Sequence, residues 1–74
     1  MAKCKIKDIL LYEGGKDQQE LAAAADLSPN TVSKFANDKE ISDKSIARIL
    51  DGLNKIATRQ KYSLEDLYTF KKPT

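Results

Sequence analysis

The chain has 74 residues, of which 41% are hydrophobic and 32% are charged, so its composition is that of one small globular domain. It contains one cysteine and no histidine, which excludes an internal disulfide and argues against a zinc site or a histidine-dependent catalytic pair. The net charge of +2 is too small to identify a partner by itself. We therefore expect a single domain over residues 1–74 that is not an enzyme and has no cofactor, no metal and no catalytic residue.

The first expected helix covers about residues 5–13. Its apolar stripe has helical spacing and comprises Ile6, Ile9 and Leu10, with Glu13 next on the same face. Gly14 and Gly15 should end the helix, because glycine readily takes the left-handed conformation of a helix cap. Cys4, just before this helix, is expected to be a small half-buried residue without a redox role.

The second expected helix begins near Asp17, which resembles the start of a capping box with Glu20. Four consecutive alanines, residues 22–25, are strong helix formers and leave room for another helix to approach closely. The helix should break at Asp26.

The third expected helix begins at Ser28 and Pro29, a capping hydroxyl followed by proline at the first helical position. Its next residues are mostly short polar side chains of low helix propensity. It should end near residues 36–38, where Asn and Asp tolerate a left-handed cap. The helix begins with favourable capping residues but continues with residues of low helix propensity. Something other than propensity must therefore explain why these polar residues are present.

The fourth expected helix begins at about residues 41–43. Its continuous apolar stripe consists of Ile46, Ile49, Leu50 and Leu53. Gly52 lies inside that pattern; it costs about 1 kcal/mol relative to alanine and would allow close packing. Residues 54–62 either extend this helix or form a basic connector.

A short fifth helix is expected from Ser63, which forms a capping-box-like pair with Asp66. Residues 68–71 alternate in polarity, which is typical of a strand. They form either a short C-terminal strand or a continuation of the fifth helix as far as Pro73.

The second and third helices are joined by only Asp26, Leu27 and Ser28, and so short a connection makes neighbouring helices cross at a large angle. Asp26 is expected in the left-handed backbone region, and Ala22 where the two helices approach. The buried faces of the two helices would consist of Leu21, Ala25, Leu27, Val32 and Phe35. This is the spacing of a helix-turn-helix.

The stretch Q-Q-E-L-A-A-A-A-D-L-S-P-N-T-V-S-K-F-A-N-D-K, residues 18–39, resembles the helix-turn-helix of the lambda Cro and repressor (Xre-type) family of regulators. The family pattern falls on Gln18, Leu21, Ala22, Asp26, Leu27, Ser28, Val32, Ser33, Asn37 and Asp38. The motif itself occupies residues 18–37, and the resemblance extends over about residues 3–70. It implies an all-α, five-helix, lambda-repressor-like DNA-binding domain, with or without the short C-terminal strand.

Two features depart from the family pattern. Asp26 and Asp38 stand where the family usually has glycine, and they add negative charge near the expected DNA. Residues 55–62 have the character of an insertion between the fourth and fifth helices, and the sequence gives it no role.

The resemblance implies that the third helix, about residues 29–37, enters the major groove of double-stranded DNA. The residues implied to contact DNA are Gln18, Ser28, Pro29, Asn30, Thr31, Ser33, Lys34, Asn37 and Lys39. In the major groove Asn pairs with adenine, Lys donates to guanine, and Ser contacts either base. By resemblance, Gln18 and the first amides of the second helix hold a phosphate, as do Asn37 and Lys39 after the third. Thr31 either contacts phosphate or completes the turn.

Two functions are consistent with these features. The first is a sequence-specific, repressor-like transcriptional regulator, cytoplasmic and homodimeric, that reads half-sites roughly 34 Å apart. Its dimer surface would include the fifth helix and residues 68–70. The alternative is a protein-interaction module of the same fold, an antitoxin or anti-repressor with weak or no DNA binding. No membrane association is expected, because no apolar run approaches the roughly 20 residues of a membrane span.

The charge distribution bears on both functions. Residues 17–41 sum to −3, which favours the alternative modestly because DNA is an anion. Residues 42–62 sum to +3 and could neutralise phosphates. Duplex binding and its salt dependence discriminate between the two functions.

Overall fold

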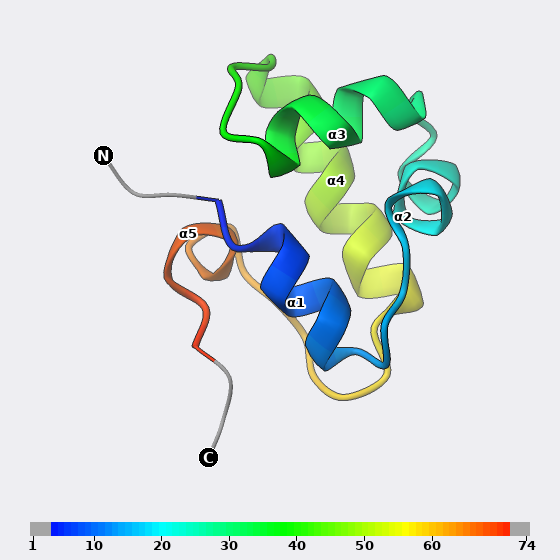
Figure 1. The fold of residues 1–74 in the computed structure, drawn as a ribbon, viewed down its shortest axis with the longest axis vertical. Coiled ribbons are helices and arrows are strands. Elements are labelled where there is room, and N and C mark those ends of the chain that lie inside the picture. Colours follow the sequence, from blue (N-terminus) through cyan, green and yellow to red (C-terminus); the bar gives the residue numbers. More distant parts are fainter. Residues whose placement is uncertain (1–3, 72–74) are drawn as a thin grey trace.

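The computed structural model describes residues 4–71, and this range holds five helices and no strand. The helices are α1 (Ile6–Tyr12), α2 (Gln18–Ala25), α3 (Pro29–Ala36), α4 (Asp43–Ile56) and α5 (Asp66–Thr69) (Figure 1). The expected all-α, five-helix fold is confirmed. None of the helices within residues 4–71 is long and apolar enough to cross a membrane.

Local caps set the starts of three helices and the end of one. Asp17, Ser28 and Ser42 each accept a hydrogen bond from the backbone N–H three residues further on, at the starts of α2, α3 and α4. Gly14 and Gly15, which follow α1, have φ angles of +97° and +78°. These caps confirm the expected starts of the second, third and fourth helices and the glycine stop after the first.

The end of the chain differs from the expectation. The fifth helix begins at Asp66 rather than Ser63, because a tight turn occupies the preceding residues, with the Asp66 N–H donating to the Ser63 carbonyl at 3.1 Å. The expected pair is present, since the Asp66 carboxylate accepts the Ser63 N–H at 2.9 Å, but it closes this turn. Of the two alternatives for residues 68–71, the short strand is wrong, and the continuation of the fifth helix holds as far as Thr69. Pro73 lies outside the described residues.

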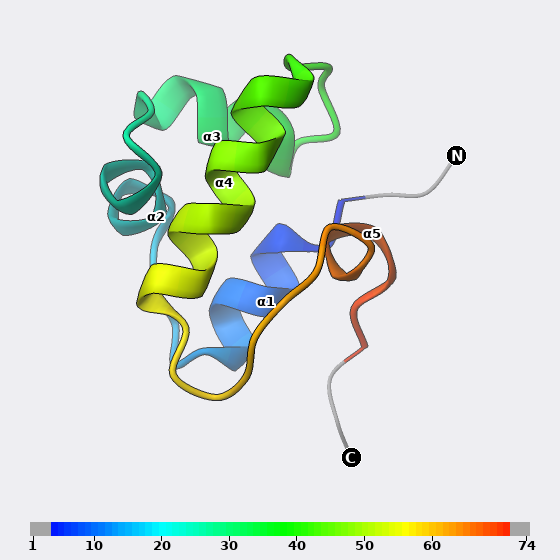
Figure 2. The ribbon, with the colours of Figure 1, turned by 180° about the vertical axis from the view of Figure 1, so that it is seen from behind.

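The long helix α4 packs across α2 and beside α3, while α1 and α5 close the other side of the domain (Figures 1 and 2). At Gly52, helix α4 packs tightly against the end of α2. A Cβ atom added there would lie 2.6 Å from the backbone nitrogen of Ala25, closer than real Cβ contacts allow. Glycine is therefore required by the packing, as its place inside the apolar stripe of α4 indicated.

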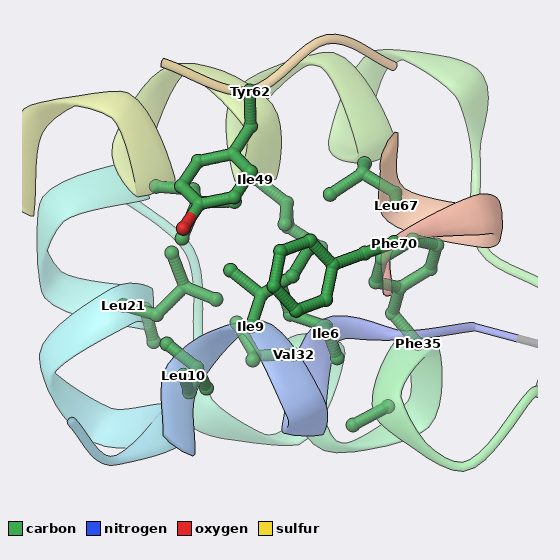
Figure 3. Packing of buried hydrophobic residues seen from close by; sticks show 13 residues of the cluster. Ile6, Ile9, Leu10, Leu21, Val32, Phe35, Ile49, Tyr62, Leu67 and Phe70 are labelled. Atoms are coloured by element: carbon green, nitrogen blue, oxygen red, sulfur yellow. The ribbon is translucent and has the colours of Figure 1, made fainter. Parts of the chain in front are cut away.

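One hydrophobic core joins all five helices (Figure 3). Its largest fully buried side chains are Ile6, Ile9, Leu21, Val32, Ile49, Leu53 and Leu67. Ala22, expected at the helix crossing, is 1% exposed. Leu27 is only half-buried and packs at the edge of the core.

The segment between α4 and α5 is tied to the core by a buried carboxylate. Glu13, 4% exposed at the end of α1, accepts hydrogen bonds from the backbone N–H groups of Thr58 and Arg59 at 2.8 and 3.2 Å and from the Tyr62 hydroxyl at 2.5 Å. Asn54 brackets the same tyrosine, accepting its N–H at 2.8 Å and donating to its carbonyl at 3.0 Å. The segment that resembled an insertion thus packs against the core, and the ring of Tyr62 lies inside it (Figure 3). We call residues 57–65, between α4 and α5, the strap.

Burial opposes ionisation of Glu13, but the hydrogen bonds from Tyr62, Thr58 and Arg59 outweigh it and lower the pKa of this carboxyl. Burial, together with the hydrogen bond to Glu13, raises the pKa of the Tyr62 phenol. At neutral pH the pair therefore consists of an ionised carboxylate and a protonated phenol, so that every oxygen has a partner of the right kind.

Candidate nucleic-acid interface

The turn between α2 and α3 has the geometry that the sequence predicts. Asp26 is left-handed, with φ 58° and ψ 45°, and its N–H bonds back to the last turn of α2. The Leu27 N–H donates to the Ala22 carbonyl at 2.9 Å, which closes the turn directly over the small residue. The chain then enters α3 through Ser28 in an extended conformation. These features turn α3 across the direction of α2 (Figure 1) and leave one face of α3 outside the core.

Helix α3 has two faces of different chemistry. Val32, Phe35 and Ala36 are buried in the core. The opposite face is polar: Pro29, Asn30 and Lys34 are exposed, whereas Thr31 and Ser33 are half-buried. Core packing therefore fixes the helix, and its low propensity is tolerated.

The first turn of α3 is held by two hydroxyl groups. The Ser28 Oγ accepts the Thr31 N–H at 3.3 Å and lies 3.0 Å from the Thr31 Oγ1. Of the two roles expected for Thr31, the structure shows completion of the turn.

An open groove brings the polar face of α3 together with two other elements. It is lined from α3 by Pro29, Asn30 and Ser33, from the start of α2 by Asp17, Gln18 and Gln19, and from α1 and the following loop by Lys7, Leu10, Leu11, Gly15 and Lys16. We call this surface the α1–α3 groove. It joins Gln18 to three of the expected α3 residues, although they are at least 11 residues apart in sequence.

The start of α2 forms one wall of the α1–α3 groove. The first N–H groups of a helix have no intrahelical acceptor. Asp17 accepts the N–H of Glu20 at 2.7 Å, so the amides of Gln18 and Gln19 are left to bind an external acceptor. Lys16 pairs with Glu20 at 3.3 Å, the one ion pair found within residues 4–71. The acidic side chains here are therefore engaged with nearby donors.

The end of α3 is fastened by Asn37. Its Nδ2 donates to the Ser33 carbonyl at 2.8 Å, and its Oδ1 accepts from the Lys7 Nζ at 3.0 Å. Lys39, exposed just beyond, donates its N–H to the Lys34 carbonyl at 2.8 Å. Asn37 thus has internal partners for both side-chain atoms, whereas Lys34 and Lys39 project into solvent.

Sequence reasoning missed Lys7 and Lys16 as members of this surface. Lys7 lies four residues before Leu11 on the exposed face of α1, a pattern that the sequence does show. Which neighbour that face meets depends on tertiary packing, so the pattern alone could not assign it.

The two aspartates that replace family glycines have different surroundings. Both are left-handed, with φ 58° at Asp26 and 63° at Asp38. The Asp38 Oδ1 accepts the backbone N–H of Cys4 at 2.6 Å. Cys4 itself is half-buried, and burial raises the pKa of its thiol, which keeps it protonated at neutral pH.

A steep two-helix crossing, a small residue at the crossing and a free polar helix face define a helix-turn-helix domain. Comparison with known families matches a helix-turn-helix family model to residues 6–59, from the start of α1 to beyond the end of α4. The chain belongs to the lambda Cro and repressor-like (Xre-type) helix-turn-helix family, a family of DNA-binding regulatory domains. Comparisons with curated proteins and with solved structures gave no match.

Proposed function

We propose that the protein is a small, repressor-like transcriptional regulator that binds double-stranded DNA in a sequence-specific manner, with α3 in the major groove. The observation that carries this proposal is the α1–α3 groove, which joins the polar face of α3 to the free amides at the start of α2. Helix amides and lysines bind phosphates and fix orientation, whereas side chains on the inserted helix read base edges.

Four exposed or half-exposed residues of α3 have the chemistry for base contacts. Asn30 can pair with adenine, Lys34 can donate to guanine and Ser33 can contact either. Pro29, exposed at the first helical position, can touch a thymine methyl group. Gln18 and Lys39 would hold the phosphates on either side of this helix.

The charge of residues 17–41 is partly offset by a lysine outside that range. Glu20 pairs with Lys16 at 3.3 Å, whereas Asp17 and Asp38 accept backbone N–H groups and keep their negative charge. The negative charge that remains is the feature that favours the alternative of a protein-interaction module.

A homodimer in the cytoplasm remains part of the proposal, because one domain of this size makes few phosphate contacts and two half-sites would add affinity. The dimer surface, however, cannot include residues 68–70 to the full extent expected. Phe70 is 7% exposed and packs between Tyr12 and Tyr62, with ring centroids 5.5 and 5.9 Å away. Tyr68 packs edge-on against Phe35 at 6.0 Å. The apolar tail expected at a dimer surface is therefore largely used inside the domain.

Selection of genomic DNA fragments with the purified protein tests the proposal. We expect enrichment of a palindromic site, with affinity for that duplex falling steeply as salt rises. Lys34→Ala should weaken binding and relax base preference at one position of each half-site by about 1–3 kcal/mol.

Lys55→Ala is the matched control, since it removes an exposed lysine in the last turn of α4 that does not line the α1–α3 groove. It should leave the base preference unchanged. Failure of the wild-type protein to bind any duplex at low salt would overturn the proposal and favour the protein-interaction module.

A further inference from the structure

Three hydrogen bonds hold the first described residues against the segment that follows α3 and against α5. The Cys4 N–H donates to the Asp38 Oδ1 at 2.6 Å, and the Lys5 N–H donates to the Leu67 carbonyl at 2.7 Å. One turn further on, the Lys7 Nζ donates to Asn37 at 3.0 Å. Residues 4 and 5, which form the lead into α1, are thus hydrogen-bonded to the end of α3 on one side and to α5 on the other.

We propose that Asp38 is a positioning residue of the DNA interface. Its carboxylate fixes the lead into α1 on the end of α3 and thereby places Lys7, which holds a DNA phosphate beside the reading helix. The inference rests on the proposed DNA-binding function and assigns a phosphate contact to a residue that the helix-turn-helix motif does not include.

The surroundings of Lys7 fit this role. Its side chain lines the α1–α3 groove together with Asn30 and Ser33. An ammonium group has three N–H donors, and Asn37 takes one of them. Lys7 forms no ion pair within residues 4–71, so its positive charge is available to an anion in the groove. Asn37 orients the ammonium without neutralising it.

The choice of residue at position 38 supports the same conclusion. A φ of 63° favours glycine, which would also avoid a negative charge near DNA. Glycine has no side chain to accept the Cys4 N–H, whereas the carboxylate does so at 2.6 Å. Asp26 serves as the comparison for Asp38. It is also exposed and left-handed, but its side chain makes no hydrogen bond within the described residues.

Three variants test the inference on a duplex that the wild-type protein binds. Asp38→Gly should weaken binding about tenfold, the loss expected for one charge-assisted contact, and should make the log–log salt dependence shallower by about 0.9. Asp38→Asn keeps the Oδ1 acceptor without the charge, so it should bind at least as tightly as wild type with an unchanged salt slope. Asp26→Gly removes the same charge and the same backbone strain elsewhere, and it should not weaken binding.

Lys7→Gln should reproduce the loss of salt slope, and combining it with Asp38→Gly should weaken binding no further, because both variants remove one contact. Hydrogen exchange at the Cys4 amide gives a readout without DNA: it should accelerate in Asp38→Gly and stay slow in Asp38→Asn.

Tighter binding by both glycine variants would mean that the aspartates merely repel DNA, and it would overturn the inference. An unchanged salt slope in Asp38→Gly would overturn it as well, while leaving the proposed function intact. Absence of duplex binding by the wild-type protein would instead overturn the proposed function, and this inference with it.

Discussion

Glu13 occupies a position on the apolar stripe of α1 where a hydrophobic residue is usual. Its two oxygens accept from Thr58, Arg59 and Tyr62, residues 45 to 49 positions further along the chain. No buried side-chain N or O atom among the described residues lacks a hydrogen-bond partner. A single carboxylate therefore holds the strap between α4 and α5 against the end of α1.

Glu13→Gln should destabilise the domain by about 1–3 kcal/mol at pH 7, because the amide cannot accept all the hydrogen bonds that the carboxylate accepts. The pKa of Glu13 is lowered in the folded state, so its contribution is fully present above the ordinary value of 4.5 and is lost as pH falls through the folded value. Urea unfolding at neutral and acidic pH should show the difference between wild type and variant shrinking in acid.

Asp8→Asn provides the control, since it removes an exposed carboxylate from the same helix and should change stability little. A difference between wild type and Glu13→Gln that stays constant from pH 7 to acid would contradict this account of the carboxylate.

Single residues whose role is local could be predicted from the sequence. Asp17 and Ser28 cap helices through bonds that span three residues, and Asp26 takes the left-handed conformation that its place in the turn requires. The role of Glu13 could not be predicted, because its partners lie far along the chain and become neighbours only after folding.

Among the secondary-structure elements, α2 and α4 make a contact that leaves no room for a larger side chain at Gly52. Gly52 lets the backbone of α4 approach Ala25 so closely that a methyl group would overlap backbone atoms at 2.6 and 2.7 Å. Because these atoms belong to the backbone and not to the end of a flexible side chain, an added methyl group must push the two helices apart.

Gly52→Ala should therefore destabilise the domain, reversing the usual effect of this change in a helix. Helix propensity alone would stabilise it by about 1 kcal/mol, whereas overpacking costs about 1–3 kcal/mol and here includes the loss of core contacts on both helices. We expect a net loss of up to about 2 kcal/mol, measured by urea unfolding. Ala47→Gly, on the exposed face of α4, should show only the propensity cost. A stabilised Gly52→Ala protein would show that the contact is looser than described.

The boundaries of the helices, like the roles of single residues, have either local or distant causes. The starts of α2, α3 and α4 depend on caps that the sequence displays. The late start of α5 depends on the local turn between Ser63 and Asp66, whereas the absence of a strand at residues 68–71 depends on the core. Phe70 and Tyr68 turn toward aromatic partners on α1, α3 and the strap, and those contacts override the alternating pattern.

At the scale of the whole molecule, the candidate interface is assembled from α1, the following loop, α2 and α3. The sequence motif predicted the residues on α2 and α3, because the spacing of a helix-turn-helix is local. It did not predict Lys7 or Lys16, which reach the α1–α3 groove only through packing. It also treated Asp38 as an adverse charge, whereas the structure shows a carboxylate bound to the start of the described chain.

The most direct test of the central claim, that α3 reads DNA through the α1–α3 groove, is a map of backbone amide chemical shifts in the isotope-labelled protein as the selected duplex is added. The account predicts the largest changes in the first turns of α2 and α3, with further changes around Lys7, Lys16 and Lys39. Changes confined to the exposed face of α4 or to α5, with α3 unaffected, would contradict it.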